Sequence, residues 1–276
     1  MKTRILTAIV MLAIFVPILW FSEYIVYPIA LAILAAVAVL ELVKCLGLLS
    51  DLWISIPLPL LSAGITLGVR FTDGLSRPLG TITVAFFLLA LYLLALTVFR
   101  AGRTTYAAVA GLLCGCFYIT VAFASLVLLR YRPNGAFLFL LPFIGSWVTD
   151  TFAYFTGRVC GRHKLAPAVS PKKTVEGSIG GIVFAVGAFL LYGLILTAFD
   201  LTPNYLALTL LGLAVSVVSQ IGDLALSVIK RERGIKDYGR LFPGHGGVLD
   251  RFDSVIATAP LTLFFTLLGE HFVLFV

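Results

Sequence analysis

Charged residues are scarce in this sequence. Asp, Glu, Lys and Arg make up only 12% of its 276 residues, whereas hydrophobic residues make up 61%. Soluble domains usually carry about twice that share of charge, so the polar side chains are too few to cover a surface that faces water. The composition therefore excludes an ordinary soluble domain. The net charge of +7 would suggest nucleic acid in a soluble protein, but a membrane protein gathers such an excess in its cytoplasmic loops, and phosphate-bearing substrates are a third explanation. We expect no nucleic-acid partner.

Cysteines with a recognisable spacing are also missing. The four cysteines, Cys45, Cys114, Cys116 and Cys160, contain no C-x-x-C pair. Cys114 and Cys116 stand two apart in an apolar run, so on a helix they face different sides and cannot bind one ion. The sequence therefore predicts neither a disulfide framework nor a zinc site.

The chain contains repeated apolar runs of about 20 residues, which short polar breaks separate. Runs of this length can cross a bilayer as helices. We expect an all-α polytopic membrane protein with an uncleaved first helix, since no small-x-small cleavage site follows that helix. About nine transmembrane helices are predicted, at residues 5–22, 25–43, 53–69, 81–99, 105–129, 134–155, 178–199, 204–228 and 254–275.

The positive charges predict an orientation. If the N-terminus is cytoplasmic, the opposite side holds only Arg70, Arg77, Arg130 and Arg132 of the 20 Lys and Arg residues. This distribution agrees with the positive-inside rule and places the C-terminus on the opposite side. We expect one integral membrane domain over residues 1–276. Residues 1–141 would form an apolar scaffold, and residues 142–276, with polar segments at 145–177 and 227–253, would form the catalytic half.

The first polar segment contains one intramembrane acid and one basic loop. A carboxylate is costly in hydrocarbon, so Asp150 is expected to face a polar cavity, although an interfacial acid is the alternative. The run Ser170-Pro171-Lys172-Lys173-Thr174 offers cations and hydroxyls to phosphate at a helix entry. A basic loop that only sets topology or touches anionic lipid is the alternative. For Gly177, Gly180 and Gly181 we expect close helix packing.

The second polar segment combines acids, cations and a glycine turn. Asp223 precedes it, and Asp250 and Asp253 open the last predicted span on one helical face. Pro243-Gly244-His245-Gly246-Gly247 is a turn whose bare N–H groups can bind phosphate. Hard oxygen ligands beside cations are typical of a site for Mg²⁺ and phosphates. The cations of this segment are Lys230, Arg231, Lys236 and Arg251.

This segment resembles a family signature. Ser-x-x-Lys-Arg from Ser227, then Lys-Asp-x-Gly from Lys236, then Phe-Pro-Gly-His-Gly-Gly-Val-x-Asp-Arg-Phe-Asp, which ends at Asp253, is similar to the hallmark of phosphatidate cytidylyltransferases. The resemblance extends more loosely to residues 150–154 and 170–177. It implies a Mg²⁺-dependent enzyme of the cytoplasmic (inner) membrane, with its site facing the cytoplasm, that converts CTP and phosphatidic acid to CDP-diacylglycerol and pyrophosphate in phospholipid biosynthesis.

The resemblance also implies roles for residues. The metal would be held by Asp223 and Asp250, with Asp253 and Asp150 as further candidates and K⁺ as a candidate second ion. Glycine-rich helix faces are compatible with a homodimer. Catalytic roles fall on Asp223, Asp250, Lys230 and Arg231, and substrate contacts on Ser170, Lys172, Lys173, Thr174, Ser227, Lys236, His245, Gly246, Gly247 and Arg251.

Alternative functions would require different sequence patterns. An ion-coupled transporter would place polar, broken helices in two similar halves, whereas here the polar residues crowd into one. A CDP-alcohol phosphotransferase would need an Asp-Gly-x-x-Ala-Arg motif, which the chain lacks. A CTP-dependent polyprenol or lipid kinase remains open as the nearest alternative.

Overall fold

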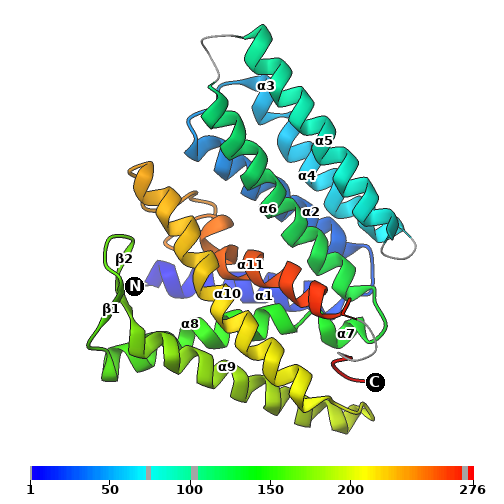
Figure 1. The fold of residues 1–276 in the computed structure, drawn as a ribbon, viewed down its shortest axis with the longest axis vertical. Coiled ribbons are helices and arrows are strands. Elements are labelled where there is room, and N and C mark those ends of the chain that lie inside the picture. Colours follow the sequence, from blue (N-terminus) through cyan, green and yellow to red (C-terminus); the bar gives the residue numbers. More distant parts are fainter. Residues whose placement is uncertain (1, 73–75, 101–104, 269–272) are drawn as a thin grey trace. The chain divides into compact units, whose positions relative to one another are not determined.

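The computed structural model describes residues 2–72, 76–100, 105–268 and 273–276, and these are almost entirely helical (Figure 1). They form two compact units. Met1–Tyr131 and Ile235–Arg251 make the first unit, and Arg132–Gly234 and Phe252–Val276 make the second. Part of the predicted catalytic half, the loop before Arg251, thus belongs with the N-terminal helices. The single domain with a boundary at 141 stays a prediction.

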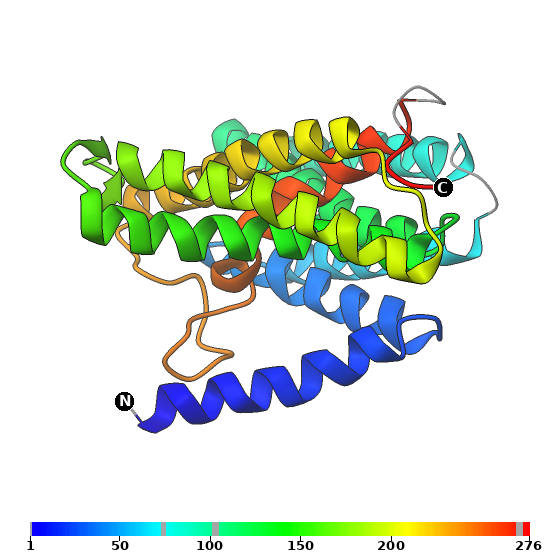
Figure 2. The same ribbon diagram turned by 90° about the horizontal axis from the view of Figure 1, so that it is seen from below.

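The first unit is a bundle of apolar helices. In it α2 packs against α4 and α6, and α5 packs against α6 (Figure 1). The chain reverses between α1 and α2, which together form a V in Figure 2. The core is filled by side chains such as Tyr27, Leu58 and Phe123, all nearly inaccessible. The elements are α1 (Lys2–Trp20), α2 (Val26–Cys45), α3 (Leu52–Ser55), α4 (Pro57–Gly68), η1 (Val69–Phe71), α5 (Ser76–Phe99) and α6 (Tyr106–Arg130).

The second unit is built on three long helices and carries a small hairpin. In it α8 packs along α9, and α10 packs against both. Two short strands, β1 and β2, pair antiparallel between α8 and α9, with Lys164 opposite Thr174 and Ala166 opposite Ser170. The elements are α7 (Gly135–Leu138), α8 (Leu141–Cys160), β1 (Lys164–Ala166), β2 (Ser170–Thr174), α9 (Val175–Leu196), η2 (Thr197–Phe199) and α10 (Tyr205–Glu232). The remaining helix, α11 (Leu249–Phe265), begins in the first unit and continues in the second.

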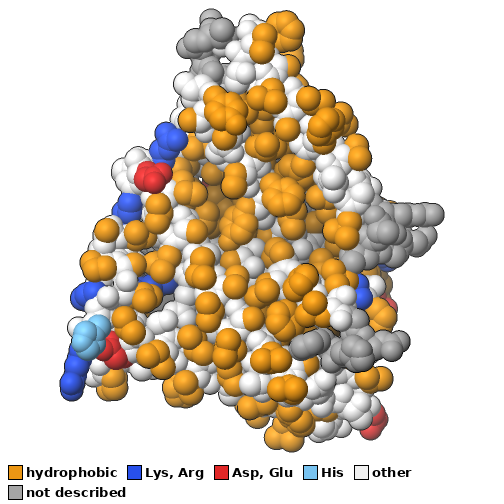
Figure 3. Space-filling model, in the orientation of Figure 1, with side chains coloured by type: hydrophobic (Ala, Val, Ile, Leu, Met, Phe, Trp, Pro, Cys, Tyr) orange, Lys and Arg blue, Asp and Glu red, His pale blue; other side chains and the backbone are white. Residues whose placement is uncertain are grey.

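Seven stretches of the described chain are long and apolar enough to cross a membrane. They coincide with seven of the predicted spans, and α1 and α11 account for the other two. On the face drawn in Figure 3, hydrophobic side chains predominate. Large exposed side chains such as Phe87 and Val183 would be unfavourable in water and are typical of a lipid-facing surface. The prediction of an all-α polytopic membrane protein is confirmed.

The observed helices differ from the predicted limits of three spans. The span at 53–69 is broken between α3 and α4, where Pro57 starts the new helix, and the span at 134–155 is split by Pro142 into α7 and α8. Proline lacks the N–H that helix continuation needs. The last span was predicted too far: α11 ends at Phe265, and Phe275 instead forms an isolated bridge with Pro203.

The expected close packing of the α9 glycines is confirmed. A Cβ at Gly177 would lie 2.6 Å from the backbone oxygen of Ala153, and one at Gly181 would lie 2.9 Å from that of Thr149. These contacts lie between α8 and α9 of one chain. They therefore give no support to the expected homodimer, which stays a prediction.

Candidate active site

The hairpin places the basic loop at the start of α9. Thr174 ends β2 and caps the helix, its Oγ1 accepting the N–H of Gly177 at 3.1 Å. A threonine at this position satisfies one of the N–H groups that a helix start leaves free. The predicted helix entry is confirmed. Lys172 is exposed and Lys173 is half-buried.

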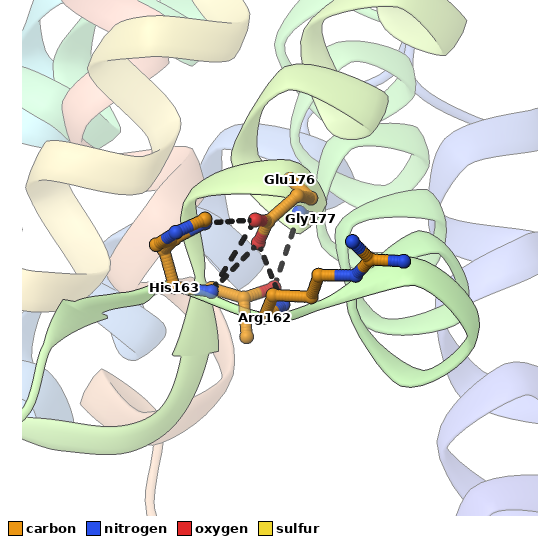
Figure 4. A network of polar contacts seen from close by, with 5 residues as sticks. Arg162, His163, Glu176 and Gly177 are labelled. Carbon is orange, nitrogen blue, oxygen red and sulfur yellow. Dashed lines mark hydrogen bonds and ion pairs between the residues drawn. The ribbon is translucent and has the colours of Figure 1, made fainter.

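A second set of polar contacts closes this hairpin at its base (Figure 4). The carboxylate of Glu176 accepts the backbone N–H groups of Arg162 and His163, and it lies 2.6 Å from Nδ1 of His163. Glu176 therefore ties the segment between α8 and β1 to the first turn of α9. The contacts give Glu176 and His163 a structural role and fix the path of the basic loop.

An ion pair joins the hairpin to α10. The Nζ of Lys173 lies 2.5 Å from Oδ2 of Asp223, and the Oγ of Ser227 donates to Oδ1 of the same carboxylate at 3.3 Å. Both oxygens of Asp223 are therefore engaged, and each partner is a residue that the sequence assigned to the site. Arg231, further along α10, donates from Nε to the backbone oxygen of Val169 at 3.3 Å and is exposed.

Three carboxylates from three helices gather around this ion pair. The charge of Asp223 acts on both Asp150 of α8 and Asp253 of α11, and the Oγ of Ser254 donates to Oδ2 of Asp150 at 3.1 Å. Lys230, almost fully buried, acts on Asp253 with the opposite sign. The second unit thus brings acids of α8, α10 and α11 together with the cations Lys173 and Lys230.

A cavity of about 310 Å³ lies against these residues. Its wall combines the acids Asp150 and Asp223 with the cations Arg158, Lys172 and Lys173. Asp150 is among the residues that line the cavity, and its role in the site stays a prediction. Acids bind metal cations and the Lys and Arg side chains bind phosphates, and this wall offers both.

The glycine turn lies in the first unit. Gly244 and Gly246 adopt φ values of +77° and +89°, a conformation that glycine reaches without strain. Phe242 and Gly246 form a bridge, and His245 donates its N–H to the oxygen of Phe242 at 2.8 Å. The Nδ1 of His245 is buried, with no hydrogen-bond partner among the described residues. The predicted turn is confirmed.

Asp250, in the first helical turn of α11, closes the glycine turn. Its Oδ2 accepts the N–H of Tyr238 at 2.7 Å and that of Gly247 at 3.0 Å. The expectation of a bare N–H at Gly247 is therefore wrong, because the buried carboxylate of Asp250 takes it. Lys236 and Arg251 are exposed. Asp223 and Asp250 belong to different units, so their convergence on one metal stays a prediction.

Sequence reasoning missed Glu41. This residue of α2 is 7% exposed, and its carboxylate accepts the N–H groups of Val248 and Leu249. Its position inside an otherwise apolar span was the available signal, since a buried intramembrane acid needs partners.

Among the described residues, no three Asp, Glu, His or Cys side chains are grouped closely enough to hold a metal by themselves. A Mg²⁺ site does not require three, because this ion commonly takes one or two carboxylates and leaves the rest to water and phosphate.

These features define an integral membrane protein with a cavity whose wall contains acids and cations, the side chains that bind metal ions and phosphates. Comparison with known proteins gives the family. The chain matches the profile of the Cytidylyltransferase family over residues 2–268, and it belongs to this family. Members of the family typically use a divalent metal.

Individual relatives cover almost the whole chain. A protein of Staphylococcus haemolyticus named phosphatidate cytidylyltransferase is 36% identical over 270 residues, which are 95% of this chain and 97% of that protein. One of Staphylococcus epidermidis with the same name is 38% identical over the same shares. One of Brucella abortus, again with this name, is 43% identical over 185 residues, 67% of this chain and 65% of that protein.

Proposed function

We propose that this chain is a phosphatidate cytidylyltransferase, which makes CDP-diacylglycerol and pyrophosphate from CTP and phosphatidic acid. The near full-length similarity to proteins of that name supports the proposal. The observation that carries it in the structure is the cavity where Asp150 and Asp223 lie beside Arg158, Lys172 and Lys173. CTP and phosphatidic acid both present phosphate oxygens, which such cations bind directly.

The reaction requires no nucleophile from the protein. A phosphate oxygen of phosphatidic acid forms a bond to the α-phosphorus of CTP, and the bond from that phosphorus to the bridging oxygen of the β-phosphate breaks. The electron pair leaves with pyrophosphate. Because the lipid phosphate is already an anion, catalysis reduces to alignment of the two phosphates and neutralisation of their repulsion.

The cations of the chain would carry out that neutralisation. We assign Lys172, Lys173 and Arg158 to phosphates at the cavity, because they line it, with Ser170 and Thr174 beside them on β2. Lys230 and Arg231 at the end of α10, and Lys236 and Arg251 in the other unit, would hold further phosphate oxygens. His245 and Gly246 would contact phosphate from the glycine turn, whereas the N–H of Gly247 is committed to Asp250.

The acids fit a divalent cation, which we propose to be Mg²⁺. Its ligands would be Asp223 and Asp250, with Asp253 and Asp150 as additional ligands or as the site of a second ion such as K⁺. The support is the chemistry of these side chains: carboxylate oxygens are hard ligands that suit Mg²⁺, and Asp150 and Asp223 line the same cavity as Lys172 and Lys173. When bound, the metal would offset charge on the phosphate oxygens of CTP. Lys173 would hold the Asp223 carboxylate in place through their ion pair.

We propose the cytoplasmic (inner) membrane as the location, with the site open to the cytoplasm. Arg158, Arg162, Lys172 and Lys173 lie between the last turn of α8 and the start of α9, and Lys230, Arg231, Lys236 and Arg240 lie between the last turn of α10 and the start of α11. Loops this rich in cations stay on the cytoplasmic side in multi-pass proteins. CTP is a water-soluble nucleotide, and this orientation gives it direct access to both loops.

The proposal is tested with purified protein in detergent–lipid micelles that contain phosphatidic acid. CTP labelled at the α-phosphate and CTP labelled at the γ-phosphate are supplied in parallel with Mg²⁺. The proposed function predicts that only the α-label moves to the lipid phase. Movement of the γ-label instead would identify a CTP-dependent lipid kinase, and no movement of either label would also refute the proposal.

A further inference from the structure

Glu41 is a buried acid that no part of the proposed mechanism uses. It lies in α2, between Leu40 and Leu42, and its side chain is 7% exposed. A carboxylate in such apolar surroundings is unfavourable unless hydrogen bonds replace the water that it loses. The carboxylate of Glu41 should therefore accept several strong hydrogen bonds from the protein.

Both carboxylate oxygens of Glu41 accept backbone N–H groups from the start of α11. Val248 donates to Oε1 at 3.0 Å, and Leu249 donates to Oε2 at 2.9 Å. Val248 and Leu249 are fully buried, so water cannot take the place of Glu41. The first N–H groups of a helix have no partner within it, and the positive end of the helix dipole favours an anion there.

The carboxylate has no ion-pair partner within the described part of the chain. The ion pairs Arg100–Asp51, His163–Glu176 and Lys173–Asp223 do not involve it. The N–H groups at the start of α11, together with the nearby positive charge of Lys44, therefore stabilise the Glu41 carboxylate. This makes the contact dependent on the position of that backbone.

The backbone around Glu41 is shaped to fit it. Gly239 and Gly247 both approach the carboxylate so closely that a Cβ on either would collide with Oε1. Glu41 thus contacts the chain before the glycine turn, at Gly239, and the last residue of the turn, Gly247. A larger residue at either position would displace the carboxylate, the turn or both.

Asp250 holds the same turn from the other side. Its Oδ2 accepts the N–H of Tyr238, next to Gly239, and the N–H of Gly247 itself. Leu249, which Glu41 binds, is the immediate neighbour of Asp250. A shift of the Leu249 backbone must therefore move the base of the Asp250 side chain.

We propose that Glu41 is a positioning residue for the reaction: it fixes the start of α11 and thereby the carboxylate of Asp250 and the turn at 243–247. The inference rests on the proposed function, since it assigns Glu41 to the support of that site. An acid of the apolar N-terminal half then controls the geometry of the charged C-terminal segment.

The test compares Glu41→Gln with Asp51→Asn in the full-length protein. Glu41→Gln keeps the side-chain size but turns an N–H donor toward one of the two backbone N–H groups. Asp51→Asn is the matched control, because Asp51 also accepts a backbone N–H at a helix start, that of Trp53 in α3. For Glu41→Gln we expect the Mg²⁺ concentration that gives half-maximal activity to rise about tenfold, as it does when groups that orient metal ligands are changed. The control should keep the value of the unsubstituted protein.

A second readout does not depend on activity. Hydrogen exchange should show the amides of Val248 and Leu249 losing protection in Glu41→Gln, while the segment around Trp53 stays unchanged. Glu41→Asp keeps the charge but is one methylene shorter, so it should give values between those of Glu41→Gln and the unsubstituted protein.

The outcomes separate the two proposals. A lower yield or stability of Glu41→Gln with unchanged Mg²⁺ and CTP dependence would overturn the positioning role and leave a structural one. Unchanged exchange at Val248 and Leu249 would overturn the anchoring contact itself. Failure of the unsubstituted protein to transfer the α-label would refute the proposed function and the positioning role with it, whereas the exchange result would still decide on the contact.

Discussion

Lys173 and Asp223 form an ion pair, with 2.5 Å between Nζ and Oδ2, that links β2 to α10. Lys173 belongs to the basic loop before α9, and Asp223 lies on α10, a few residues before the second polar segment. The contact lies at a cavity that also exposes Asp150, Arg158 and Lys172. In the proposed mechanism, Lys173 can orient an acid that binds metal and can also contact a phosphate.

Replacement of Lys173 by alanine should therefore impair catalysis more than folding. Loss of a charged hydrogen bond costs about 2 kcal/mol, which corresponds to roughly a thirtyfold fall in kcat/KM for CTP. Lys164→Ala is the matched control, since Lys164 is an exposed cation of β1 that does not line the cavity. Steady-state kinetics measure both variants, and equal effects would contradict a specific role for Lys173.

Asp250→Asn should abolish turnover and leave membrane insertion intact. The asparagine also accepts the N–H groups of Tyr238 and Gly247 less well, so the free energy of unfolding should fall by about 1–3 kcal/mol. Activity and thermal unfolding in detergent check the two effects separately. Retained activity would remove Asp250 from the metal site and leave it as the residue that closes the glycine turn.

Asp253→Asn should raise the requirement for Mg²⁺. The negative charges of Asp223 and Asp150 act on Asp253. When one carboxylate near a bound cation is lost, the affinity for the cation commonly falls about tenfold or more. Mg²⁺ titration of activity is the measurement, with Asp237→Asn as the control because Asp237 is an exposed acid of the loop before the glycine turn. If Asp253→Asn and the control give the same Mg²⁺ dependence, Asp253 is not part of the metal site.

Gly177→Ala should destabilise the contact between α8 and α9. The added Cβ would lie 2.6 Å from the backbone oxygen of Ala153, and overpacking of this kind costs about 1–3 kcal/mol. Gly187→Ala on the same helix meets nothing within 4 Å and should be neutral or slightly stabilising. Thermal unfolding distinguishes the two, and equal stability would mean that α8 and α9 can separate without cost.

Much of the fold could be predicted from apolar run length, because a bilayer permits few alternatives to helices of that length. The limits of the helices were less predictable. Pro57 and Pro142 interrupt runs that hydropathy alone reads as continuous, and α11 stops at Phe265 although apolar residues continue beyond it.

The chemical character of the site could also be predicted, since Lys172, Lys173, Asp223 and Asp250 stand out in polar segments. Their partners could not be predicted. The contacts of Glu41 with Val248 and Leu249 join residues about 200 positions apart, and no local pattern records such a contact. The use of the Gly247 N–H by Asp250 was hidden for a related reason, because it depends on the fold of the turn.

In the proposed reaction, a lipid phosphate displaces pyrophosphate from CTP. Its most direct test is the mass of the lipid product formed from phosphatidic acid that carries ¹⁸O in its phosphate, together with an assay of the released phosphates. The proposed reaction gives a lipid that has gained one cytidine monophosphate and kept all of its ¹⁸O, with one unlabelled pyrophosphate released for each lipid. A lipid that gains only one phosphate, with CDP as the other product, would contradict it.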